Sequence, residues 1–177
     1  MHEAEPPALY AAVRSRVGAG SALAVLHVGA QSTWLAAGTG AAAHDQWTLA
    51  AGWLRTAREC GFDAPPTSRQ VETAIHAIEE TLMRSGAALA QDCPVYALDP
   101  ALRELAVTAR LAQGEPGRAI LLDVEDVERA FTRLARVVQG RPAAHEGLPE
   151  SPAFAARLLI LRELMNHVPF SPLTLLV

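Results

Sequence analysis

The chain has 177 residues, half of them apolar, and a formal net charge of −4. A chain of this size and composition can bury one sizeable core, so we expect a single domain over residues 1–177. The acidic balance excludes a general binder of nucleic acid or of acidic membranes, because such proteins gather cations against phosphates. The N-terminus lacks a secretory pattern and no apolar run reaches the ~20 residues of a membrane helix, which predicts a cytoplasmic protein without membrane contact.

Two further counts limit the chemistry. Cys60 and Cys93 lie far apart and form no metal or redox motif, so we expect reduced thiols, with one long-range disulfide as the alternative pairing. All fifteen basic residues are Arg, which excludes catalysis by Lys.

The first half of the chain predicts a helix followed by a hairpin. Apolar residues at helical spacing behind two prolines predict a helix over residues 6–17. Two apolar runs, residues 22–28 and 33–37, flank a short turn of small and polar residues, which is typical of a tight β-hairpin. Such a turn can direct backbone N–H groups and the hydroxyls of Ser32 and Thr33 at a phosphate.

The next segment, residues 46–54, carries Trp47, Leu49, Ala51 and Trp53 at alternate positions and predicts a third strand, although residues 50–60 also fit a helix. Thr67 and Ser68 then form a helix start signal. We expect a helix over residues 68–84, with its core stripe formed by Val71, Ile75, Ile78 and Leu82.

The second half alternates strands with helices. We predict strands over residues 93–98, 119–122 and 173–177, helices over 100–111, 124–138 and 153–167, and a turn over 114–117. A strand meander followed by alternating helices and strands predicts an α/β fold, a central mixed β-sheet with flanking helices. We expect the Arg stripe of the 124–138 helix and the pair His145 and Glu146 to be solvated.

Residues 22–38, ALAVLHVGAQSTWLAAG, resemble a known signature. This is the phosphate-binding "DIGGGSTEL" hairpin of the exopolyphosphatase and guanosine pentaphosphate phosphohydrolase family, a branch of the actin-like ATPase superfamily. The matching positions are Gly29, Ser32, Thr33 and Leu35. His27 stands where the family has Asp, Trp34 where it has Glu, and Ala30 and Gln31 replace two glycines.

The resemblance continues in order over residues 9–177. Residues 94–111 resemble a second phosphate turn of the family, with Leu98, Asp99 and Pro100 in place of Gly-Gly-Thr, and residues 120–137 and 147–177 resemble its later helices and last strand. The resemblance implies a ribonuclease H-like half of an actin-like fold, equivalent to the family's second domain. We expect the first domain, which supplies a catalytic carboxylate in the family, to be missing.

These replacements bear on catalysis. Phosphoanhydride hydrolysis depends on a metal ion held by carboxylates and on backbone donors. His27 is a poor ligand for Mg²⁺, Pro100 lacks an N–H donor, and Asp99 repels phosphate. The resemblance therefore implies a non-catalytic module for binding or regulation, without a metal or cofactor. Its degenerate phosphate loops comprise His27, Gly29, Gln31, Ser32, Thr33 and Asp99.

Other functions stay open at this point. The chain could bind phosphate, a nucleotide or polyphosphate, or form a hydrolase that a separate first domain completes in trans. His27 could act as a base for Ser32 or Thr33 with Asp99 as the orienting acid, or bind a transition metal together with His44 and Asp45. An open hollow between the loops would favour ligand binding, and a hollow plugged by Gln31, Trp34 and Pro100 would exclude it.

A large aromatic beside the degenerate site suggests a contact surface. Because Trp34 replaces a charged residue and residues 173–177 end the chain on an apolar run, we expect a homodimer or a complex with another chain. The hairpin side or a C-terminal edge strand would form the interface, with Trp34 as an interface residue.

Overall fold

The computed structural model describes residues 6–18, 20–90, 92–111, 117–168, 170 and 172–177. Its strands form one mixed sheet in the order β3-β2-β1-β4-β6-β5. The strands are β1 (Leu23–Val28), β2 (Thr33–Gly38), β3 (Asp45–Leu49), β4 (Val95–Ala97), β5 (Ile120–Leu122) and β6 (Leu173–Leu175). The first three form an antiparallel meander, β4 and β6 run parallel to β1, and β5 is antiparallel to β6. The predicted mixed sheet is confirmed.

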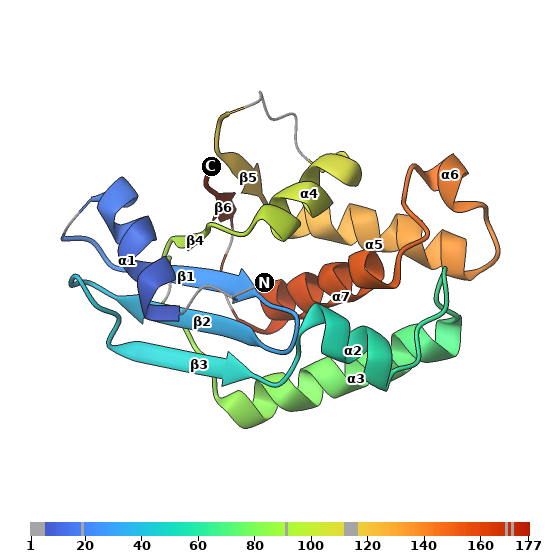
Figure 1. Cartoon of the computed structure of the whole chain (residues 1–177), viewed down its shortest axis with the longest axis horizontal. Coiled ribbons are helices and arrows are strands. Elements are labelled where there is room, and N and C mark those ends of the chain that lie inside the picture. Colours follow the sequence, from blue (N-terminus) through green and yellow to red (C-terminus); the bar gives the residue numbers. More distant parts are fainter. Residues whose placement is uncertain (1–5, 19, 91, 112–116, 169, 171) are drawn as a thin grey trace.

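The helices surround this sheet (Figure 1). They are α1 (Pro6–Val17), α2 (Trp53–Glu59), α3 (Ser68–Ser85), α4 (Pro100–Thr108), α5 (Val124–Val138), α6 (Ala143–Glu146) and α7 (Pro152–His167). None of them combines the length and apolarity of a membrane-spanning helix within the described residues.

Helix α7 is the centre of the larger core. It packs against α2, α3 and α5 and buries ten of its sixteen residues. Figure 1 shows it running between α3 and α5. Because α7 is covered on several sides, its apolar residues do not form a single stripe.

The hairpin is buried on both faces. Alternate residues of β1, such as Leu26 and Val28, join the large core, whereas Leu23 and Val25 join a smaller cluster beneath α1. Both faces of β1 and β2 are therefore apolar, and sequence alternation cannot show which face meets the larger core.

Three helices begin with a side-chain cap, and the one at Thr67 was predicted. Thr67 and Gln70 form a capping box at α3, Asp123 and Asp126 form one at α5, and the Asp99 side chain caps α4. Each cap satisfies backbone N–H groups that the first turn leaves without a helical partner.

The boundaries differ from the prediction where a tertiary contact decides them. The strand predicted over residues 46–54 ends at Leu49, and Trp53 begins α2 instead. The N–H groups of Trp53 and Leu54 donate to the carbonyls of Gly29 and Ala30, so the hairpin turn fixes where this helix starts. The predicted 114–117 turn lies outside the described residues except for Gly117.

Two more expectations concern the ends of the chain and its thiols. The predicted C-terminal edge strand is wrong, because β5 pairs outside β6 and the sheet edges are β3 and β5. Both Cys60 and Cys93 are free thiols, as expected.

Candidate functional site

The two predicted phosphate loops meet at one edge of the sheet. Strand β1 runs parallel to β4, with Val25 beside Tyr96. The carboxyl ends of parallel strands lie at the same edge, so the residues after them come together. Here the end of β1 brings His27 next to Asp99, the residue that precedes α4. The prediction that the fold places Asp99 near His27 is confirmed.

The Asp99 carboxylate is bound by both loops. Its Oδ1 accepts hydrogen bonds from the N–H groups of Ala101 at 2.9 Å and Leu102 at 3.4 Å, in the first turn of α4. Its Oδ2 accepts one from the N–H of Val28 at 3.1 Å and lies 3.1 Å from Nδ1 of His27. The residue is only 5% exposed. This carboxylate therefore joins the hairpin to the start of α4.

These contacts set the charge of the carboxyl group. Burial raises the pKa of Asp99, but the hydrogen bond and positive charge of His27, with the N–H groups of Val28 and Ala101, outweigh burial and lower the pKa below its ordinary value. Asp99 is consequently an anion at neutral pH.

The hairpin turn is packed against the start of α2. Its Gly29 N–H donates to the Ser32 carbonyl at 2.9 Å, and its Ala30 carbonyl accepts from Leu54 and Arg55 at 3.0 Å. A Cβ atom at Gly52 would lie 2.4 Å from the backbone of Gln31, so only glycine fits there. The turn thus uses its carbonyl oxygens to cap α2, and those N–H groups of α2 are not available to an anion.

The hydroxyls of the turn differ in accessibility. Thr33 is fully buried and its Oγ1 donates to the Ala51 carbonyl at 2.5 Å, so its predicted availability as a nucleophile is wrong. Ser32 is half-buried and Gln31 is exposed. Of the two hydroxyls, only Ser32 lies where a ligand could reach it.

Trp34 does not offer a contact surface. It is 4% exposed and packs with Tyr10 and Val13 of α1 in the smaller core. The predicted exposure of Trp34 at an interface is wrong, because α1 covers this face of the hairpin. No local pattern in the sequence shows that a helix lies over that face.

The proposed metal set of His27, His44 and Asp45 is also wrong. Along the hairpin, His27 pairs with Trp34, which pairs with Thr48, whereas Asp45 pairs with Ala37 toward the other end of β2. His44 and Asp45 are exposed and pair with each other at 2.7 Å. His27 therefore lies at one end of the hairpin strands, and His44 and Asp45 lie toward the other end.

Two charged residues that we expected to be solvated are structural. Arg133 donates to the Ala109 carbonyl and to the Glu146 carbonyl, linking α5 to α4 and α6. Glu146 is 8% exposed and pairs with Arg136 and Arg141. These partners are 5 to 24 residues apart in sequence and meet across turns between elements, so no helical spacing pattern could have revealed them.

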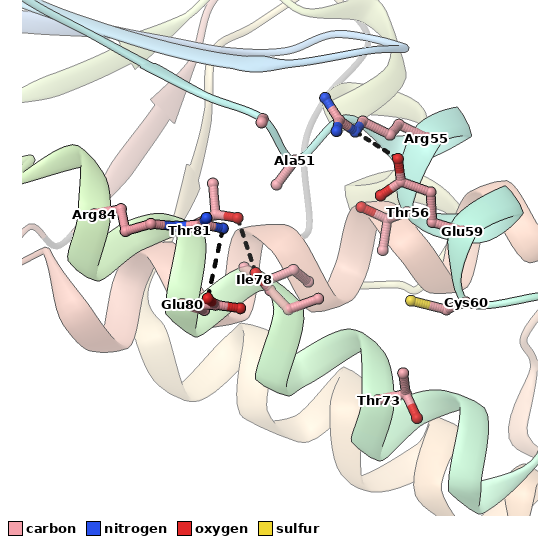
Figure 2. Close-up of a pocket in the computed structure, with 12 residues that line it drawn as sticks. Ala51, Arg55, Thr56, Glu59, Cys60, Thr73, Ile78, Glu80, Thr81 and Arg84 are labelled. Atoms are coloured by element: carbon pink, nitrogen blue, oxygen red, sulfur yellow. Dashed lines mark hydrogen bonds and ion pairs between the residues drawn. The ribbon is translucent and has the colours of Figure 1, made fainter.

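A hollow of about 290 Å³ lies between α2 and α3 (Figure 2). Its cations face carboxylates, since Arg55 lies 2.9 Å from Glu59 and Arg84 lies 3.9 Å from Glu80. Burial, with a smaller effect of Glu59, raises the pKa of the Cys60 thiol that lines it, so this thiol is not activated. None of the predicted site residues lines this hollow.

Comparison with known proteins supports the fold. A scan against protein families and a search of curated proteins find no match. Among solved structures, the chain is similar to a Ppx/GppA phosphatase from Aquifex aeolicus in its type II variant, with a TM-score of 0.71 and 14% identity over 97% of this chain and 59% of the other. It is also similar to an exopolyphosphatase from Cytophaga hutchinsonii, with a TM-score of 0.67 and 12% identity over 96% of this chain and 57% of the other.

These similarities define the architecture. The chain spans less than three-fifths of the length of the solved chains that it matches. Its six-stranded mixed sheet with flanking helices is similar to the fold of part of the solved Ppx/GppA structures. The predicted fold class is confirmed.

Proposed function

We propose that this chain is a non-catalytic exopolyphosphatase-like domain that acts as a binding or regulatory module. The observation that supports this most is the position of the Asp99 carboxylate. It accepts from Val28, which precedes the hairpin turn, and from the first turn of α4, so it lies between the two loops that resemble phosphate-binding turns. The chain's own anion takes up these donors.

A phosphate ligand would have to displace Asp99 or approach it. Backbone N–H groups at a helix N-terminus bind anions well, but here the cap occupies them. Two unit negative charges 4 Å apart repel by about 4 kcal/mol at an effective dielectric constant near 20. A buried, ionised Asp99 therefore opposes phosphate binding between the loops.

The loops also do not fit a magnesium ion. Mg²⁺ requires several oxygen ligands in near-octahedral geometry. His27 and Trp34 stand where the resembled signature has its two acids, and the remaining carboxylate, Asp99, is engaged with backbone donors and His27. The same arrangement opposes the alternative of a hydrolase completed in trans, because that enzyme would still need these loops to accept phosphate.

A phosphate-release assay tests the proposal. The purified chain is incubated with polyphosphate or guanosine pentaphosphate in Mg²⁺ or Mn²⁺, with the Cytophaga hutchinsonii exopolyphosphatase as the positive control. We expect no release above buffer. Metal-dependent release that His27→Ala or Ser32→Ala abolishes would show that the chain is an enzyme.

A further inference from the structure

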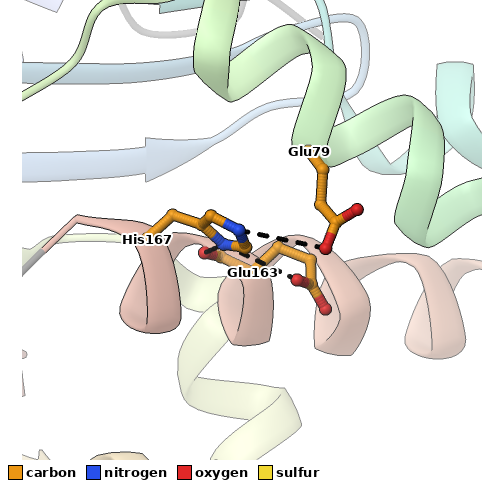
Figure 3. Close-up of side chains that lie close together, drawn as sticks. All are labelled: Glu79, Glu163 and His167. Atoms are coloured by element: carbon orange, nitrogen blue, oxygen red, sulfur yellow. Dashed lines mark hydrogen bonds and ion pairs between the residues drawn. The ribbon is translucent and has the colours of Figure 1, made fainter.

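Three side chains from two helices converge away from the phosphate loops (Figure 3). Glu79 belongs to α3, and Glu163 and His167 belong to α7, which packs against α3. Glu163 and His167 are four residues apart, so their side chains lie on the same face of α7. Each residue offers one ligand atom, a carboxylate oxygen of each Glu and a ring nitrogen of His167. These three atoms lie within 4.8 Å of one another.

The ring of His167 is held in one orientation. Its Nδ1 lies 2.9 Å from the Glu163 carbonyl oxygen, which can only accept, so Nδ1 carries a proton. In the neutral ring the lone pair is then on Nε2, which lies 3.9 Å from Oε1 of Glu79. A histidine that donates one nitrogen to a backbone carbonyl keeps the other available as a metal ligand. Here that other nitrogen faces Glu79, whereas Oε2 of Glu163 lies 3.7 Å from Nδ1 and has to turn toward Nε2 to share an ion.

The surroundings carry more negative than positive charge. The Glu163 side chain is 3% exposed and binds Arg162, and the same Arg162 also binds Glu128. The third carboxylate, Glu79, faces only the imidazoles of His167 and His76 among the pairs described. Two carboxylates thus share one guanidinium group and Glu79 has no Arg partner among the pairs described, which leaves two negative charges when both imidazoles are neutral and favours a divalent cation.

We propose that Glu79, Glu163 and His167 bind a divalent transition metal ion such as Zn²⁺. One imidazole nitrogen and two carboxylate oxygens suit zinc, whereas Mg²⁺ and Ca²⁺ prefer oxygen ligands alone. Ligand atoms 2.0–2.2 Å from one tetrahedral ion are about 3.4 Å apart, so the 3.9 Å between His167 and Glu79 closes with a small side-chain movement.

The site is also accessible. His167 lines a hollow of about 250 Å³ together with Leu82, Met83, Gly86, Ala87 and Val168. Among the three ligands only His167 lines this hollow, which has space for water as a further ligand, while Glu79 is half-buried and reached from the surface of α3. Because its ligands come from α3 and α7, the bound ion would clamp the central helix of the core to its neighbour.

Calorimetric titration of the metal-free chain with Zn²⁺ tests this site. We expect one saturable site per chain, and binding at least tenfold weaker in both His167→Ala and Glu163→Gln. The control is His44→Ala, which removes an exposed histidine paired with Asp45 at the start of β3 and leaves the affinity unchanged. His167 is 40% exposed, so its replacement leaves the fold intact.

A second readout separates binding from folding. A ligand that binds only the native state raises the melting temperature with its concentration, so Zn²⁺ should raise that of wild type and His44→Ala but not that of His167→Ala. Unchanged Zn²⁺ affinity in His167→Ala, loss of binding in His44→Ala, or no saturable binding by wild type would each overturn the proposal.

Discussion

At the end of β4, the Asp99 carboxylate accepts hydrogen bonds from Val28 and from the first turn of α4, and it contacts His27. Hydrogen bonds to an ionised acceptor are stronger than those between neutral groups. One side chain therefore stabilises the junction of two loops and at the same time occupies their anion-binding donors. In the proposed function, this same residue opposes phosphate binding between the loops.

The pH dependence of stability tests the charge of Asp99. Because the folded-state pKa lies below the ordinary value of about 3.9, Asp99 stabilises the fold fully above that pH and loses this effect as the pH falls through the lowered pKa. Asp99→Asn keeps a capping side chain but lacks the charge, and should cost about 1–3 kcal/mol at pH 7. Urea unfolding of both proteins between pH 7 and 3 measures the difference.

The informative quantity in that experiment is the difference between wild type and Asp99→Asn, since other carboxyl groups titrate in both. We expect a clear difference at pH 5 that shrinks below pH 4. A difference that stays the same down to pH 3, or is absent at pH 7, contradicts an ionised and hydrogen-bonded Asp99.

The sequence was informative about some of these residues and silent about others. The proximity of His27 to Asp99 was predicted through the resemblance of residues 94–111 to a second phosphate turn of the family. The burial of Trp34 could not be predicted, because both hairpin faces are apolar and the position of α1 is a tertiary contact. The link from Arg133 to α6 likewise depends on residues that meet only in the fold.

Helix α3 shows how much of an element its local sequence determines. Its N-cap signal at Thr67 and Ser68 and its apolar stripe predicted the helix to within one residue. The stripe differs in detail, because the fully covered positions are Val71, Ala74, Ile78 and Leu82, while Ile75 is only half-buried. Ala74 therefore takes the place in the buried stripe that we predicted for Ile75.

The different burial of Ile78 and Ile75 makes Ile78→Ala and Ile75→Ala a matched pair of substitutions. Ile78 is 1% exposed in the main core, so Ile78→Ala should cost about 2–5 kcal/mol, the usual range for a buried large-to-small change. Ile75→Ala removes the same atoms from a partly solvated position and should cost less than half as much. Denaturant unfolding measures both, and equal losses would show that the assigned face of α3 is wrong.

Short elements were harder to predict. Strands β4, β5 and β6 have three residues each, too few for a periodic pattern, and their pairing partners fix them. Helix α2 starts where it meets the hairpin turn. Long capped helices follow from local sequence, whereas these elements depend on contacts.

The predicted homodimer stays a prediction, but the surface that we expect to form its interface changes. Strands β3 and β5 form the sheet edges, and an edge strand can pair with another chain. Leu121 on β5 and Val177 are both 61% exposed. We now expect self-association at the β5 edge, in place of an interface built on Trp34.

Light scattering at micromolar concentration measures this association. We expect a mass of twice 18.8 kDa for wild type and a shift to the monomer mass in Leu121→Arg. The matched control is Met83→Arg, because Met83 is 75% exposed on α3 and lies on no sheet edge. A monomeric wild type, or equal effects of both variants, would leave the β5 edge without a role in association.

The central claim is that the chain's own carboxylate closes the phosphate site. The most direct test measures the melting temperature of wild type with increasing polyphosphate in the presence of Mg²⁺. Any ligand that prefers the native state must raise that temperature. The account predicts no change up to millimolar ligand. A concentration-dependent rise that Ser32→Ala abolishes would contradict it.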